Sequence, residues 1–278
     1  MTQPLLLSRL APLLVIFLAL FTLIVQGCGG GGGGNDRASN ADPAGYYTND
    51  GFASVDDGAG STIENLNDLQ GLVSPDKKLM MLSVKTGVAY VGTFTVSGNN
   101  FSGLVDVYEA GVMTQEDVPI INGLITQGAT MTGDLDGIGR AAKGSFTLNY
   151  AGTLDNEPVE LARVYYNLDW KPVNNSESFT ISLEEETAPI PNFSSGSFGL
   201  GKFDSCGFLG RIEPIPGRHL YTLSGGMSRC ENSNSLSNGI LQPEAYSGLV
   251  SVRGTDPDDR LIVVLTNGIY GIIGEYKR

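Results

Sequence analysis

The chain has few of the residue types on which most catalytic and metal centres depend. Its 278 residues include one histidine, one tryptophan and three cysteines, and no cluster of zinc or haem ligands is visible. A Ser-His-Asp or Cys-His site would have to use His219, but no nucleophile motif accompanies it in Arg218–Leu223. We predict that His219 lies at the surface or on an edge strand, and that the chain is not an enzyme.

Positive charge is also scarce. The sequence has 17 lysines and arginines against 30 aspartates and glutamates, a net charge of −13. Nucleic-acid binding requires clusters of lysine and arginine on phosphates, and a polybasic membrane patch requires the same residues. We therefore predict no nucleic-acid partner and no charge-driven membrane contact. Solubility and self-repulsion explain the acidic excess.

One long hydrophobic run is present, Leu10–Val25. It is shorter than the roughly 20 apolar residues that span a bilayer, and it contains Pro12. A cleaved secretory signal has an apolar region of about 7–15 residues and a small residue at its cleavage site, so we predict a signal peptide over residues 1–27. An uncleaved transmembrane helix and an ordinary signal peptide that does not need Cys28 are the alternatives.

The run ends in Val25-Gln26-Gly27-Cys28, which resembles the lipobox of bacterial lipoproteins, although leucine is commoner at the first place. The resemblance implies that the Cys28 thiol is acylated and becomes the mature N-terminus. It implies the membrane and the lipoprotein processing and sorting machinery as partners, with a covalent lipid and no other cofactor. Gly29 stands where aspartate favours inner-membrane retention in this family, so the resemblance implies the outer membrane, on its periplasmic side or at the cell surface.

Residues 28–44 are expected to form a lipidated, flexible tether. The glycine run Gly29–Gly34 precedes a polar segment, and glycine gives the backbone its widest freedom. Treated as a coil, Gly29–Ala44 has an r.m.s. reach of about 20–25 Å. A phosphate-binding loop would need a preceding strand and a following helix with Lys-Ser or Lys-Thr, and neither is present.

With Cys28 assigned to lipid, Cys206 and Cys230 are left as a pair. Envelope compartments are oxidising, so we predict a disulfide between them. It would close a loop of about 24 residues and add roughly 3 kcal/mol by chain-entropy arithmetic. A metal bound by the pair is the alternative, but a third and a fourth ligand are missing.

The acidic runs do not form a metal-binding motif. Calcium requires several oxygens in one loop. Asp134 and Asp136 supply two without a later glutamate, so Asp256, Asp258 and Asp259 come nearest to a site. We predict no metal centre. The other acidic runs, expected in solvated turns or at strand ends, are Asp56-Asp57 and Glu184-Glu185-Glu186.

From Leu79 onward, apolar and polar residues alternate. This period puts one face of a strand on a core and the other in water. Asn267-Gly268 between two apolar runs is a strong hairpin signal, so Arg260–Leu265 and Ile269–Tyr276 should pair antiparallel. Only Thr62–Leu72, whose apolar residues stand three apart, predicts a short helix.

Gly-x-apolar triplets recur about once per predicted strand. Glycine within a strand often marks bending or the close approach of another backbone, so the repeat predicts a meander that curls into a barrel or a coiled sheet. Chance in a chain with 38 glycines is the alternative. The triplets begin at Gly92, Gly103, Gly123, Gly133, Gly144, Gly210, Gly248 and Gly274.

We predict an all-β protein made of antiparallel meanders that form two small curled sheets or barrels. Residues 45–155 would form the first domain, and residues 156–278 the second, which carries the disulfide. The boundary lies near Leu154–Pro158, and one large β domain is the alternative. Trp170 is expected to fill a core.

This architecture resembles lipocalin-type barrels and the barrel lobes of outer-membrane receptor lipoproteins such as transferrin-binding proteins, without a motif that matches residue by residue. The resemblance implies a non-catalytic lipoprotein that binds a ligand or partner or braces the envelope. The alternative is an envelope hydrolase with two acidic side chains about 5–10 Å apart in a cleft. An apolar cavity inside a barrel would favour binding.

Overall fold

The computed structural model describes residues 39–56, 62–154, 168–172, 179–183, 197–203, 206–230, 245–253 and 260–277. Asn40–Arg278 is one unit of the chain. The all-β, antiparallel prediction is confirmed. Within the described residues, no helix has the length and apolar character needed to cross a membrane. The predicted signal peptide, Cys28 and most of the tether lie outside the described residues.

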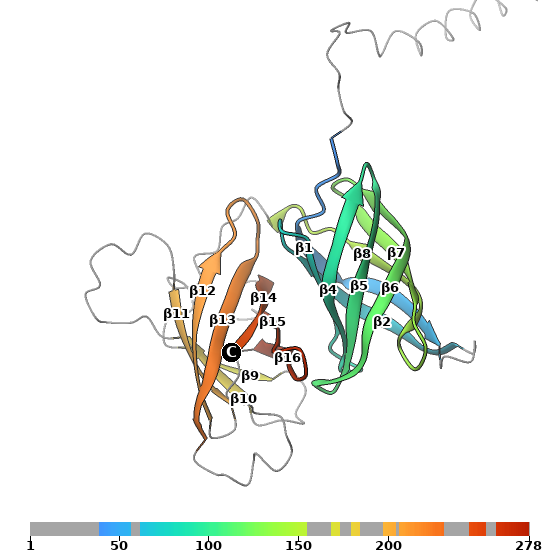
Figure 1. Cartoon of the computed structure of the whole chain (residues 1–278). Helices are drawn as coiled ribbons and strands as arrows, with labels where there is room; N and C mark the ends of the chain where they lie inside the picture. The colour runs from blue at the N-terminus through green and yellow to red at the C-terminus, as the bar shows by residue number, and fades with distance from the viewer. Residues whose placement is uncertain are drawn as a thin grey trace, which may run out of the picture. The chain divides into compact units, whose positions relative to one another are not determined.

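Eight strands close into a first barrel, in which each strand pairs antiparallel with the next and the last pairs with the first. Figure 1 shows β4, β5 and β6 as neighbouring ribbons of this barrel. Its strands are β1 (Gly45–Asp56), β2 (Thr62–Val73), β3 (Lys78–Ser83), β4 (Val88–Ser97), β5 (Asn100–Glu109), β6 (Val112–Thr126), β7 (Thr130–Asp136) and β8 (Lys143–Asn149).

Eight further strands close a second barrel, in which β9 pairs with both β10 and β16. These strands are β9 (Leu168–Pro172), β10 (Phe179–Leu183), β11 (Ser197–Phe203), β12 (Cys206–Pro214), β13 (Tyr221–Cys230), β14 (Ala245–Arg253), β15 (Arg260–Thr266) and β16 (Gly271–Lys277). The chain thus passes from one barrel to the other between Asn149 and Leu168. The domain limits at residues 155 and 156 stay a prediction, as does the core role of Trp170, whose side chain is outside the described part.

The predicted hairpin around Asn267-Gly268 is confirmed. β15 and β16 pair antiparallel from Arg260 opposite Lys277 to Thr266 opposite Gly271. Asn267 Oδ1 accepts hydrogen bonds from the backbone N–H groups two and three residues later, at 3.0 and 2.8 Å. Gly268 has a φ of 92°, which glycine adopts without a steric penalty.

The predicted helix over Thr62–Leu72 is wrong, because this segment lies in strand β2. Its apolar spacing comes from a β-bulge. Ala53 of β1 faces Leu66 and Gly51 faces Leu69, so two residues of β2 lie opposite the single residue Phe52. The extra residue turns Leu66 and Leu69 to the same inner face although they are three apart, and both are fully buried.

Five glycines of the repeat stand where neighbouring strands come unusually close, whereas a Cβ at Gly133 or Gly274 would meet only side-chain atoms, at 3.1 and 3.4 Å. A Cβ at Gly92 would lie 1.9 Å from the Leu104 carbonyl oxygen, and one at Gly103 would lie 2.3 Å from the Thr93 carbonyl oxygen. Side chains cannot fit there, so the close-approach interpretation is confirmed at these positions. The same crowding by a carbonyl oxygen occurs at Gly123, Gly144 and Gly248.

Apolar side chains fill the interior of the first barrel. An eight-stranded barrel is just wide enough inside for side chains to pack across it. Phe94 and Phe101 stack edge to face with ring centroids 5.5 Å apart. Both belong to one buried cluster to which β1 to β8 all contribute, including Tyr47, Leu69, Met81, Val118, Met131 and Phe146.

A second apolar cluster contains residues of both barrels. β3 and β15 each carry apolar residues on both faces, so one set fills the barrel and the other lies outside it. Two backbone hydrogen bonds also join the barrels, from Met113 N to Ile269 O at 3.0 Å and from Gly271 N to Gly111 O at 2.8 Å. This second apolar cluster includes Leu72, Met80 and Leu82 of the first barrel together with Leu249, Ile262 and Val264 of the second.

Candidate functional site

A buried polar network lies next to the cluster that joins the barrels. The Tyr46 hydroxyl of β1 donates to Gln70 Oε1 of β2 at 3.1 Å, and Gln70 Nε2 donates to Glu275 Oε2 of β16 at 3.1 Å. The other carboxylate oxygen accepts from Arg253 Nη2 at 2.6 Å and lies 3.5 Å from Arg260 Nε. Three side chains from three strands, Gln70, Arg253 and Arg260, therefore meet the Glu275 carboxylate, and Tyr46 joins the network through Gln70.

The electrostatics of this network favour a structural role. Tyr46, Gln70 and Glu275 are almost inaccessible to solvent. Burial raises the pKa of the Tyr46 hydroxyl above its ordinary value, with a smaller opposing effect of Arg253, so the hydroxyl stays a proton donor to Gln70. Two arginines compensate the Glu275 charge. Both oxygens of the Glu275 carboxylate contact protein side chains, and a buried charge requires such partners.

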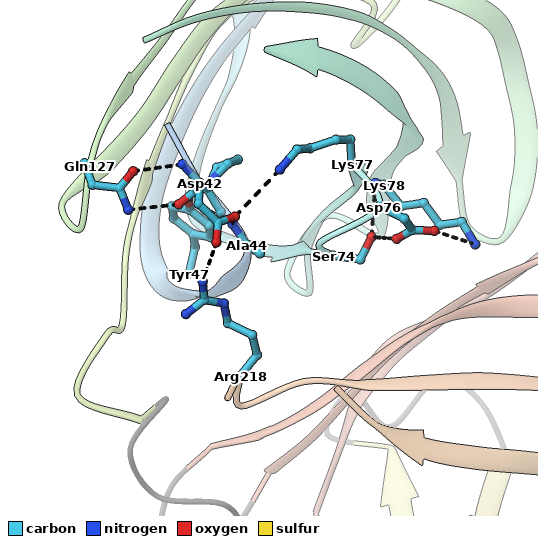
Figure 2. A network of polar contacts seen from close by, with 10 residues as sticks. Asp42, Ala44, Tyr47, Ser74, Asp76, Lys77, Lys78, Gln127 and Arg218 are labelled. Carbon is cyan, nitrogen blue, oxygen red and sulfur yellow. Dashed lines mark hydrogen bonds and ion pairs between the residues drawn. The ribbon is translucent and has the colours of Figure 1, made fainter. Parts of the chain in front are cut away.

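A second network holds the segment that leads into β1. Two hydrogen bonds join Asp42 and Gln127. The Asp42 backbone N–H donates to Gln127 Oε1 at 2.9 Å, and Gln127 Nε2 donates to the Asp42 carbonyl oxygen at 3.0 Å. Its carboxylate accepts from Arg218 Nη2 at 2.6 Å and lies 3.6 Å from Lys77 Nζ. Figure 2 shows these side chains converging on Asp42 from different parts of the chain.

The charge of Asp42 is stabilised by these contacts. Burial alone would raise its pKa, but hydrogen bonds from Ala44 N and Arg218, with the charges of Arg218 and Lys77, lower it below its usual value. The stability that the contacts add is therefore present at neutral pH and is lost only as the pH falls through this lowered pKa. Asp42 thus fixes the segment that leads into β1 against the barrel.

The pairing of β5 with β6 contains register shifts, and at two of them two residues of β6 lie opposite one residue of β5. Val105 faces Val118 and Val107 faces Gln115, so Glu116 and Asp117 both lie opposite Asp106. Asp117 has a φ of 54° and donates its N–H to Asp106 Oδ1 at 3.0 Å. The side chain of Asp106 thus replaces a partner that regular strand pairing would supply.

The second bulge has the same form. Phe101 faces Gly123 and Gly103 faces Ile120, so two residues of β6 lie opposite Ser102. Asn122 has a φ of 52°, and its Nδ2 donates to Asp134 Oδ2 at 2.8 Å. Aspartate and asparagine adopt this left-handed region more readily than other residues with a side chain, so both suit the bulge positions.

Apolar side chains project from this bulged face into solvent. Leu104 and Leu124 are each 46% exposed and Ile121 is 40% exposed, with the half-buried Pro119 opposite Leu104. We call Leu104, Pro119, Ile121 and Leu124 the β5–β6 surface. A group of exposed apolar residues within a polar rim is typical of an interaction site.

The prediction for His219 is wrong. The side chain is only 4% exposed and Ser251 Oγ donates to its backbone carbonyl at 2.7 Å. Its Nε2 hydrogen bonds the Val252 carbonyl oxygen, and because a carbonyl only accepts, Nε2 carries the proton. Strand β14, which comes later in the chain, supplies both partners, so local patterning could not reveal the burial.

The other predicted site residues are only partly covered. Asp134 bonds Asn122, and no group of three or more possible metal ligands occurs among the described residues. Asp256, Asp258 and Asp259 lie outside them, as do Asp57 and Glu184-Glu185-Glu186.

Cys206 and Cys230 are backbone partners across β12 and β13, with a register shift directly after Cys206. Cα atoms directly opposite in an antiparallel pair are about 4.5–5.5 Å apart, within the range of disulfides. The disulfide stays a prediction, because the side chains are outside the described part. Non-reducing peptide mapping of the mature protein should yield one linked fragment that contains both cysteines; free thiols at both positions would contradict the bond.

The β5–β6 surface and the Glu275 network were not predicted from the sequence. One signal for the surface was present: residues 86–139 contain no lysine, arginine or histidine but six acidic residues. No such signal existed for the network, since Gln70 and Glu275 are 205 positions apart.

Comparison with known proteins adds no functional assignment: no family model, no curated protein and no solved structure matches the chain.

Proposed function

We propose that the chain is an outer-membrane lipoprotein, anchored through Cys28, that binds a partner through the outside of its first barrel and has no catalytic activity. The observation that carries the binding function is the β5–β6 surface, where apolar residues stay exposed on a bulged strand pair. The packed interior of the same barrel supports this placement, because its apolar side chains occupy the space that an enclosed ligand would need.

The alternative function, an envelope hydrolase, would need two acidic groups facing a cleft. Among the described residues, the buried carboxylates are Asp68 and Glu275. Asp68 accepts from Ser83 Oγ at 2.6 Å and from Lys85 N at 2.9 Å. Asp68 stabilises the turn between β3 and β4, and Glu275 links strands of the two barrels. These contacts favour a structural role for both carboxylates.

The Asp42 network supports the anchor. The turns between β2 and β3, between β4 and β5, and between β6 and β7 all bond the lead-in segment through Lys77, Gly98 and Gln127. A chain that begins at Cys28 would meet the barrel at this end after about a dozen residues, with an r.m.s. reach of about 20 Å. The barrel would thus stay close to the membrane surface.

Metabolic labelling with a fatty-acid analogue tests the anchor. The wild-type protein should be labelled and should sediment with outer membranes, whereas Cys28→Ser should be unlabelled because it lacks the acylated thiol. Gly29→Asp is the matched control for sorting: it should be labelled equally but be retained in the inner membrane. Equal labelling of wild type and Cys28→Ser would contradict the anchor.

A further inference from the structure

The β5–β6 surface lies in a region of one charge sign. Strands β5, β6 and β7 together carry Asp106, Glu109, Glu116, Asp117, Asp134 and Asp136, and no lysine, arginine or histidine occurs in residues 86–139. The acidic residues Glu116 and Asp117 are exposed, and Asp106 and Asp134 are half-buried. Glu109 forms an ion pair with Arg140 at 3.6 Å, and Asp136 lies opposite Lys143 of β8. The other four carboxylates stand beside the exposed apolar residues with no lysine or arginine as a cross-strand partner: Asp106, Glu116, Asp117 and Asp134.

The bulges set which side chains reach the solvent. A regular strand alternates inward and outward residues, but at each bulge two successive residues of β6 face outward: Glu116 with Asp117, and Ile121 with Asn122. Each bulge therefore adds one outward side chain to this face. The positive φ of Asp117 and Asn122 goes with these bulges, which present apolar and acidic groups side by side.

Strand addition cannot explain recognition at this face. β5 and β6 are interior members of a closed ring, so their backbone groups are already paired with β4, β7 and each other. A partner that extends a sheet needs an unpaired edge. The surface therefore offers side chains only, which are apolar in the middle and anionic around them.

We propose that the β5–β6 surface binds a polypeptide segment that carries lysine or arginine beside apolar side chains. The apolar residues of the partner would cover Leu104, Ile121 and Leu124, and its cations would lie against the Asp106–Asp117 group and Asp134. The inference rests on the proposed binding function and names its partner by chemistry. A bilayer is disfavoured as the occupant, because anionic headgroups would be repelled by the same carboxylates.

The binding test uses the mature full-length protein in detergent micelles and a short fluorescent peptide of alternating lysine and leucine. The peptide should bind to a saturable site, and binding should weaken as salt rises because screening shortens the reach of exposed charges to about 8 Å at physiological ionic strength. A glutamate–leucine peptide should not bind. A lysine–serine peptide lacks the apolar side chains and should bind at least about tenfold more weakly than the lysine–leucine peptide. A tenfold loss of affinity corresponds to about 1.4 kcal/mol of lost apolar contact.

Variants of the protein locate the site. The double variant Leu104→Thr/Ile121→Thr should bind the lysine–leucine peptide with an affinity about tenfold lower, or lower still. Phe52→Thr is the matched control, since Phe52 is 40% exposed on β1, which is four strands from β5 and three from β6 in the ring, and should leave binding unchanged. Unaltered thermal midpoints would show that both variants fold.

Two outcomes would overturn the inference: equal affinity of Leu104→Thr/Ile121→Thr and wild type, or equal affinity of the lysine–leucine and glutamate–leucine peptides. Cys28→Ser should bind the peptide like wild type, so a failed anchor and a failed binding surface give different results.

Discussion

Gly248→Ala is expected to prevent stable folding of the second barrel. Gly248 of β14 faces Leu265 of β15, and a Cβ there would lie 1.8 Å from the Val264 carbonyl oxygen and 2.9 Å from the Leu265 Cα. Relief of such a clash requires β14 and β15 to separate, which breaks barrel pairing. We expect a loss of about 4 kcal/mol or more, in the range of exceptional single substitutions.

Thermal unfolding of the mature protein measures this effect. A loss of that size corresponds to a fall of about 10 °C in midpoint for a domain of this length, or to insoluble protein. Gly226→Ala on the neighbouring strand β13 is the matched control, because nothing lies within 4 Å of a Cβ there. It should leave the midpoint unchanged or raise stability by about 0.4–1 kcal/mol through the unfolded state. Equal midpoints for wild type and Gly248→Ala would contradict the close approach.

Glu275→Ala is expected to cost about 2–4 kcal/mol. Removing one partner of a buried ion pair typically costs about 3–5 kcal/mol, and we take a lower range because the side chains of Arg253 and Arg260 are 29% and 26% exposed. The substitution also leaves Gln70 Nε2 without its acceptor in a buried site. Two like charges would then face each other with no carboxylate between them.

Denaturant unfolding of the mature protein checks this prediction. Lys277→Ala is the control on the same strand, since Lys277 is exposed and surface substitutions usually change stability by no more than about 0.5 kcal/mol. The loss should be specific to Glu275, and the unfolding transition should broaden because the network joins strands of both barrels. A change for Glu275→Ala as small as that for Lys277→Ala would show that the network adds no stability.

Particular residues show where local pattern was informative. The alternation in Phe146-Thr147-Leu148 placed Phe146 and Leu148 in the core of a strand, where both are buried. Asn267-Gly268 predicted its hairpin because turn geometry depends on the two residues themselves. Gly92 was recognised as a site of close approach because glycine alone lacks the atom that would collide.

Predictions from the local sequence pattern were wrong where a segment distant in the chain determined which side chains are buried. Leu66 and Leu69 have helical spacing, but pairing with β1 creates the bulge that turns both inward. His219 has a polar side chain in a turn-rich segment, yet Val252 and Ser251 bury it with hydrogen bonds. In each case the deciding partner is supplied by another strand.

By itself, the sequence determined the all-β class, the antiparallel hairpins and the glycine positions, because these depend on residues close together in the chain. Only the tertiary structure decided that Glu275 meets Gln70 and that Leu104, Ile121 and Leu124 share one exposed face. Barrel closure and strand register bring together residues from separate strands, and neither is encoded in any short segment. The exposed apolar face of β5 and β6 therefore appears only when the strands are paired.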